Sequence, residues 1–300
     1  MTSTKWIQAI TELCRDNSEQ VEQAFLDAGA VSVTLQDAAD QPILEPGVGE
    51  TPLWDRCILK ALFPAATNTE ITARKLVEKL PANSEIRWQL LEDKDWSQAW
   101  KKYFKPISCA QERLWICPSW TQPPNPKAVN LLLDPGLAFG TGSHPTTLLC
   151  LNWLEQQPLA GKTLIDFGCG SGILGIAALL LGATQVWGID NDPQALLASR
   201  DNAERNGLSE HQLITLSPED IPATIQADVV VANILAEPLI GLAEQISNLV
   251  RPAGKLCLSG ILHHQIEAVT QPYRPYFEFD PVINQDEWVQ LSATHTASCG

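Results

Sequence analysis

This 300-residue sequence has few of the features that mark metal-binding, disulfide-linked or membrane-spanning proteins. None of its eight cysteines belongs to a CxxC pair, and none of its five histidines lies at ligand spacing from such a pair, so we expect no disulfide framework and no metal site. The longest apolar stretch, residues 173–183, is too short to cross a bilayer, which takes about 20 residues. We therefore expect no membrane segment.

Basic residues are also scarce, with 20 Lys and Arg against 35 Asp and Glu and a net charge of −15. Proteins that bind nucleic acid regardless of sequence need a basic surface to neutralise phosphates, so no direct nucleic-acid binding is expected. Residues 126–300 carry most of the imbalance, with 7 basic against 18 acidic residues. This half would attract a basic partner, although the charge serves solubility equally well.

The N-terminal residues lack the continuous apolar segment of a secretory signal, which favours a cytoplasmic protein. Apolar residues make up 45% and charged residues 18%, as is typical of a globular chain. The length exceeds the roughly 100 to 200 residues of one domain, so two domains are expected. We expect the protein to act as a monomer.

Residues 1–94 alternate between extended and helical patterns in the order βαββαβ. This order predicts a ferredoxin-like α+β domain, in which two helices cover one face of a small sheet. The expected strands are residues 6–14, 30–36, 54–63 and 85–91, and the expected helices are residues 18–28 and 69–80.

Residues 95–126 are expected to connect two domains. Trp96, Trp100 and Phe104 recur at helical spacing and predict an amphipathic helix, which either packs on a domain, the reading we favour, or presents its lysines to a partner. A hairpin through residues 114–117 follows, and the proline-rich segment TQPPNPK marks a boundary near residue 126.

Residues 127–300 alternate strand-like apolar runs with helical stretches, which predicts a doubly wound, mostly parallel α/β sheet of Rossmann type. Such sheets bind ligands at the carboxyl ends of their strands. The expected strands are residues 131–134, 163–168, 185–190, 227–235 and 255–260, and the expected helices are residues 146–156, 173–181, 193–206 and 238–249.

The segment DFGCGSG, residues 166–172, directly follows an apolar strand and carries the densest chemical signal. Glycines at alternate positions let the backbone turn sharply and approach a ligand closely. The segment also fits the GxGxxG pattern of a nicotinamide dinucleotide site, with Asp190 placed about 20 residues on. Asp166 favours a different ligand, because its carboxylate can receive the ammonium group of an amino acid. Together with a ribose at Asp190, this indicates S-adenosylmethionine, which has an amino acid at one end and a ribose at the other.

Two polar residues end other strands of this sheet. Asp190 ends the run QVWGID and can accept hydrogen bonds from both ribose hydroxyls. Asp192 precedes a proline and is predicted to cap the next helix. Asn233 follows the run DVVVA and offers an amide to a substrate nitrogen.

The glycine-rich segment DPGLAFGTGSHPTT, residues 134–147, precedes these motifs. We expect a loop over the methionine end of the ligand, with Phe139 excluding water and Thr146 or Thr147 capping the next helix. His144 is expected to be structural or to face the substrate, not to act as a base.

Together with LIDFGCGSGILGIAA, GIDNDPQALLASRDNAERNG and VVVANILAEPL, this segment resembles the bacterial ribosomal protein L11 methyltransferases. The upstream EDKDWSQAWKKYFKPI and LWICPSW are also similar, so the resemblance covers residues 86–290. It implies an N-terminal domain that recognises the ribosomal protein and a class I methyltransferase domain that methylates lysine ε-amino groups and the N-terminal α-amino group. It also implies cofactor contacts at Thr147, Gly168, Asp190 and Asn233. From its position at the end of a strand, Asn233 is in addition our candidate catalytic residue, which would orient the amine.

Two other functions stay open from the residues alone. One is a nicotinamide-dependent oxidoreductase, and the other is a non-catalytic cofactor-binding module that acts as a ribosome adaptor. The motif around Asn233 disfavours the adaptor, since it supplies a group that faces the substrate.

Overall fold

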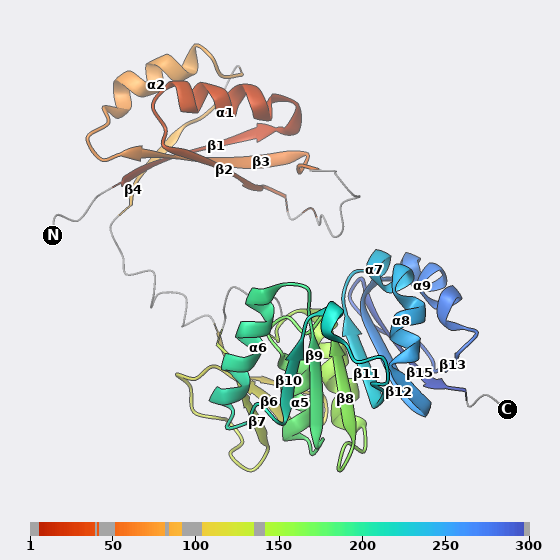
Figure 1. Cartoon of the computed structure of the whole chain (residues 1–300). Coiled ribbons are helices and arrows are strands. Elements are labelled where there is room, and N and C mark those ends of the chain that lie inside the picture. The colour runs from red at the N-terminus through yellow and green to blue at the C-terminus, as the bar shows by residue number, and fades with distance from the viewer. Residues whose placement is uncertain are drawn as a thin grey trace. The chain divides into compact units, whose positions relative to one another are not determined.

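The structure is a computed structural model that describes residues 6–39, 41, 52–81, 84–91, 104–134 and 142–296. The chain divides into two compact units, Met1–Lys101 and Lys102–Gly300, which we describe one at a time (Figure 1). Within the described residues, no helix is long and apolar enough to cross a membrane, and no three His, Cys, Asp or Glu side chains gather as a metal site would require.

The first unit is a four-stranded antiparallel sheet in the order β2-β3-β1-β4, with helices α1 and α2 on one face (Figure 1). Alternate strand residues point toward the helices, so Leu59 and Phe63 of β3 are fully buried together with Phe25 of α1 and Leu76 of α2. The predicted ferredoxin-like fold is confirmed. Its elements are β1 (Trp6–Cys14), α1 (Ser18–Asp27), β2 (Ser32–Asp37), β3 (Arg56–Pro64), α2 (Thr69–Val77) and β4 (Arg87–Leu91).

The second unit contains an eight-stranded sheet whose main path has the order β10-β9-β8-β11-β12-β15-β13. The first five strands of this path are parallel neighbours, whereas β15 runs antiparallel between β12 and β13. β14 also pairs with β15. The strands are β8 (Thr163–Phe167), β9 (Gln185–Ile189), β10 (Leu213–Leu216), β11 (Ala227–Asn233), β12 (Val250–Leu262), β13 (Phe277–Phe279), β14 (Ile283–Gln285) and β15 (Trp288–His295).

This order confirms the predicted doubly wound α/β fold and differs from that of dinucleotide-binding domains. Their six parallel strands have the order 3-2-1-4-5-6, so the sixth strand lies directly beside the fifth. Here the antiparallel β15 takes that place beside β12.

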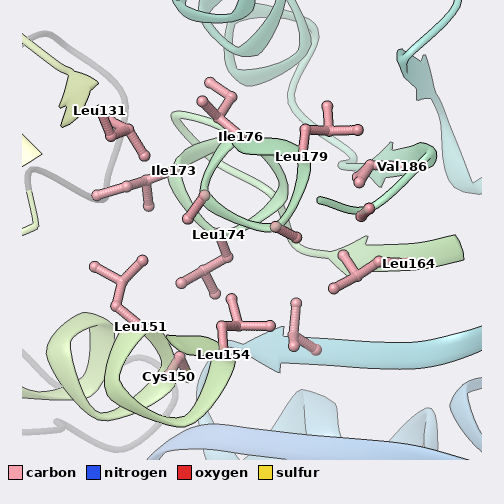
Figure 2. Close-up of a cluster of buried hydrophobic side chains, with 14 of the residues drawn as sticks. Leu131, Cys150, Leu151, Leu154, Leu164, Ile173, Leu174, Ile176, Leu179 and Val186 are labelled. Carbon is pink, nitrogen blue, oxygen red and sulfur yellow. The ribbon is translucent and has the colours of Figure 1, made fainter. Parts of the chain in front are cut away.

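Helices cover both faces of the sheet. On one face lie α4 (Pro145–Gln156), α5 (Ile173–Leu180) and α6 (Pro193–Arg205), and on the other lie α7 (Ala236–Gly241), α8 (Ala243–Asn248) and α9 (Ile266–Tyr273). Successive strand residues serve opposite cores, as Leu164 and Ile165 do. Figure 2 shows the first core, where Leu151 and Leu154 of α4 face Leu174 of α5.

Strands of the expected connector belong to the second unit. β5 (Ile107–Ser108) and β6 (Leu114–Cys117) form the expected hairpin, and β6 pairs in parallel with β7 (Val129–Leu132) across the proline-rich segment. Buried Glu155 of α4 anchors the hairpin, since its carboxylate accepts backbone N–H bonds of 2.7 to 3.0 Å from the hairpin turn. Trp96 and Trp100 of the predicted helix lie outside the described residues.

The C-terminal region differs most from expectation. The single helix predicted over residues 238–249 is wrong, because the chain leaves helical geometry at Leu242 (φ −103°, ψ 12°), just after Gly241, and forms the two short helices α7 and α8. The strand predicted over residues 255–260 is the central part of the longer β12. The sequence patterns did not predict α9 or β13 to β15.

Candidate functional site

Several of the predicted site residues meet at the carboxyl edge of the parallel sheet. β8 and β11 are neighbours, with Asp166 opposite Val231, so Asn233 ends β11 at the edge where the glycine segment leaves β8. β9 adds Asp190 at the same edge, and the Gly168 N–H donates to the carbonyl of Ile189 at 2.8 Å. The edge is therefore built by residues from three strands.

The glycine segment takes a backbone path that other residues rarely adopt. Gly168, Gly170 and Gly172 have φ values of 75°, 53° and 77°, in the left-handed region. A Cβ atom on Gly168 would also lie 2.3 Å from Cγ2 of Ile234. Glycine at 168 thus allows the turn after β8 and the turn after β11 to approach each other.

Two residues of α6 that the sequence did not single out hold this segment in place. Ser199 Oγ donates to the carbonyl of Gly170, and Asn202 Nδ2 donates to that of Ser171, both at 2.9 Å. Both side chains are buried. The only sign of this role in the sequence is that Ser199 and Asn202 are polar residues one helical turn apart in a predicted helix.

Asp190 is half-buried and already oriented by the backbone. Its Oδ2 accepts from the Gly170 N–H at 2.9 Å, and its Oδ1 accepts from the Asp192 N–H at 3.0 Å. Each carboxylate oxygen can accept a second bond, so a pair of hydroxyls can still bind. The predicted cap is confirmed, since Asp192 accepts from the Gln194 N–H and Pro193 begins α6.

Asp166 is buried with only part of its hydrogen-bonding capacity used. Its Oδ2 accepts from the Gly175 N–H at 2.9 Å, whereas its buried Oδ1 has no partner. Burial raises the pKa of this carboxyl from 3.8 to about 7; the Gly175 bond opposes the rise and the charge of Asp190 adds to it. A cation beside Oδ1 would remove this penalty.

Asn233 has a similar arrangement. Its Nδ2 donates to Thr147 Oγ1 at 3.3 Å, while its Oδ1 is buried and has no partner. Thr147 is fully buried in the first turn of α4. The pair therefore leaves one amide oxygen available to an incoming donor.

The start of α4 corrects one expectation. Neither Thr146 nor Thr147 caps this helix; His144 is its N-cap, and Pro145 is its first residue. His144 is thus structural, as expected. Phe139 lies outside the described residues.

The side chains of Asp166, Asp190 and Asn233 offer acceptors to a ligand. Asp166 and Asn233 each present a buried oxygen without a partner, and Asp190 adds a half-buried carboxylate. These groups suit an ammonium group, ribose hydroxyls and an amine N–H. A pyrophosphate would bring negative charge toward Asp166, whose own charge is already uncompensated, so the arrangement disfavours a dinucleotide.

Comparisons with known proteins agree with this chemistry. A family model described as ribosomal protein L11 methyltransferase (PrmA) matches residues 5–296. The ribosomal protein L11 methyltransferase of Cellvibrio japonicus is 53% identical over 292 residues, which cover 96% of this chain and 98% of that protein. The one from Hahella chejuensis is 52% identical over 287 residues, covering 96% and 97%. A crystal structure of a ribosomal protein L11 methylase from Lactobacillus delbrueckii subsp. bulgaricus has a TM-score of 0.58 and 32% identity, and covers 64% of this chain and all of that one.

Proposed function

The chain belongs to the ribosomal protein L11 methyltransferase family, and we propose that it transfers methyl groups from S-adenosylmethionine to lysine ε-amino groups and the N-terminal α-amino group of ribosomal protein L11. The observation that carries this proposal is the pair of buried acceptor oxygens without partners, Oδ1 of Asp166 and Oδ1 of Asn233. One suits the ammonium group of the cofactor and the other suits the amine of the substrate.

The described residues fit S-adenosylmethionine at both of its polar ends. Asp166 would hold the ammonium group, because a cation compensates its buried charge. Asp190 would accept from the ribose hydroxyls, and Gly168 and Thr147 would border the cofactor between these ends. When bound, the cofactor supplies an electrophilic methyl group on a sulfonium.

Asn233 is proposed as the residue that orients the amine. A lysine amine has a reference pKa of about 10.4, so it must lose a proton before its lone pair can react, and burial in the site favours the neutral form. Asn233 Oδ1 can then accept an N–H of the neutral amine and fix the direction of the lone pair. In well-oriented systems, holding the reacting groups in place lowers the activation barrier by up to roughly 7 to 11 kcal/mol.

The two units of the chain suggest that substrate recognition and methyl transfer are carried by different parts of the protein. We propose that residues 1–94 recognise ribosomal protein L11, that residues 95–126 connect, and that residues 127–300 carry the reaction. We also propose that the protein acts as a monomer. The net charge of −15 disfavours direct nucleic-acid binding, and a ribosomal substrate fits a reaction in the cytoplasm.

The test of this function is the Asn233→Ala variant. We expect the methylation rate at saturating cofactor to fall at least about tenfold, equivalent to roughly 1.4 kcal/mol, with a smaller loss of cofactor affinity. Exposed Asn248 on the far face of the sheet supplies the matched control, Asn248→Ala, which should behave like wild type. Full recovery of the rate at high cofactor concentration would show that Asn233 only binds cofactor.

The same purified protein tests the two alternative functions. A single turnover with labelled cofactor and purified ribosomal protein L11 transfers label only if the protein is an enzyme. Hydride transfer from a nicotinamide without methyl incorporation would establish the oxidoreductase, which the family membership does not favour.

A further inference from the structure

We propose that His144 is a positioning residue for methyl transfer, which caps α4 so that Thr147 holds the side-chain amide of Asn233 in one orientation. The inference rests on the proposed role of Asn233 in orienting the amine. His144 itself is not assigned a contact with substrate or cofactor.

The ring of His144 supplies the cap of α4. Its backbone is extended (φ −70°, ψ 138°), and its Nδ1 accepts from the Thr146 N–H at 3.3 Å and lies 2.8 Å from Thr146 Oγ1. An Nδ1 that accepts from a backbone N–H must be unprotonated, and burial lowers the pKa of this imidazole, which favours that form. The cap satisfies one of the N–H groups that a helix start otherwise leaves unpaired.

The same ring ties the start of α4 to β15. It lies edge-on to Trp288, with ring centroids 5.1 Å apart and planes inclined by 66°. Trp288 packs in a small cluster with Leu149 of α4 and Leu262 of β12. Ser, Thr, Asp and Asn are the usual helix caps, but their short side chains would not reach Trp288. Histidine joins both contacts in one side chain.

The capped turn is the one that reaches Asn233. Thr147 is the third residue of α4, fully buried, and its Oγ1 receives the Asn233 Nδ2–H at 3.3 Å. An uncapped first turn frays, because its N–H groups seek other partners. Fraying would release Thr147 and let the amide of Asn233 rotate, so that its free oxygen no longer points at the amine.

Two variants separate the contacts of His144. His144→Phe keeps a ring against Trp288 and removes the acceptor, whereas His144→Asn keeps a capping acceptor and removes the ring. We expect His144→Phe to lower kcat on ribosomal protein L11 at least about tenfold with the KM for S-adenosylmethionine within about threefold, and His144→Asn to retain kcat within about threefold. Exposed His211 supplies the control, His211→Phe, which should match wild type.

A double-mutant cycle then tests whether His144 acts through Asn233. In the Asn233→Ala background, adding His144→Phe should lower kcat by less than about twofold, because the amide it positions is gone. Losses that multiply, an unchanged kcat in His144→Phe, or an equal loss in His144→Asn would each overturn the inference. Thermal denaturation checks that each variant is folded. If His144→Phe unfolds, the kcat of His144→Asn still tests the inference, because a large loss there would contradict it. If the wild-type enzyme transfers no methyl group to ribosomal protein L11, the proposed function itself fails.

Discussion

Replacing Asp166 by asparagine should change stability and cofactor binding in opposite directions. Asp166 is 1% exposed, and burial is the largest cause that raises its pKa from 3.8 to about 7. Each pKa unit corresponds to about 1.36 kcal/mol, so holding this carboxylate ionised costs the folded protein roughly 4 kcal/mol above pH 7. Asparagine removes the charge and keeps an oxygen for the Gly175 N–H.

The sign of the pH dependence follows from the raised pKa. Below pH 3.8 Asp166 is protonated in both the folded and the unfolded state, so it adds no pH dependence to the free energy of unfolding. Between pH 3.8 and about 7 the folded state binds more protons than the unfolded state, so the free energy of unfolding falls as pH rises. Above about pH 7 the penalty is complete.

The amide of the variant brings a cost of its own. Its NH2 group replaces the oxygen that has no partner, and an unsatisfied buried donor costs about 1 to 3 kcal/mol. At pH 8 we therefore expect Asp166→Asn to raise the free energy of unfolding by about 1 to 3 kcal/mol. Near pH 4 this advantage of the variant should largely disappear, since Asp166 is then protonated in the folded state and partly protonated in the unfolded state.

Cofactor affinity should fall in the same variant. Losing a charge-assisted hydrogen bond to the ammonium group, about 1.5 to 3 kcal/mol, weakens binding roughly 10- to 150-fold. Urea denaturation at pH 8 and pH 4.5 without cofactor, together with calorimetric titration of S-adenosylmethionine, measures both effects. A variant that is less stable at pH 8 and binds cofactor normally would refute the reasoning, because Asp166 would then be a structural carboxylate.

Asp228 supplies a control of opposite sign at the other end of the same strands. Burial tends to raise the pKa of its carboxyl, but hydrogen bonds from the Thr163 N–H and hydroxyl and the charges of Lys162 and Arg251 lower it overall. A lowered folded pKa stabilises the protein above the unfolded pKa and is lost as pH falls through the folded one. Asp228→Asn should therefore destabilise the protein at pH 8 and leave cofactor affinity unchanged.

Two further predictions concern the division of tasks. Asp190→Ala should weaken S-adenosylmethionine binding about 10- to 150-fold, because the ribose hydroxyls lose their charged acceptor, with the far-ultraviolet circular dichroism preserved; calorimetry showing unchanged affinity would remove Asp190 from the site. Deleting residues 1–101 should leave a chain that binds the cofactor but no longer methylates ribosomal protein L11, and equal activity of the truncated and full-length enzymes would disprove that the first unit recognises the substrate.

Much of the site was predictable because parallel strands end at one edge of a sheet. Gly168, Asp190 and Asn233 each follow an apolar run, and a doubly wound sheet brings the ends of β8, β9 and β11 together whatever the intervening lengths. Asp192 was predictable for a local reason, since an aspartate before a proline caps a helix within a few residues. Both signals lie in short stretches of sequence.

The contacts that hold the site were not predictable, because their partners are distant in sequence or unusual in type. The hydrogen bond between Asn233 and Thr147 joins residues 86 positions apart. Ser199 donates to the carbonyl of Gly170, a contact that no sequence pattern predicts. His144 caps α4 although histidine is not among the preferred caps. The short strands β13 and β14, three residues each, carry too little periodicity to be seen.

Comparing Asp166 with Glu155 shows why the free oxygen at 166 indicates a ligand. Both side chains are almost completely buried. Both oxygens of Glu155 accept backbone N–H bonds from the β5–β6 hairpin, so its burial is compensated and its role is to hold that hairpin. Asp166 has a free oxygen, a raised pKa and a position at the carboxyl edge of β8, where Asn233 has a second free oxygen. We therefore expect a bound cation to compensate the charge at 166, whereas the hairpin N–H groups already compensate the charge at 155.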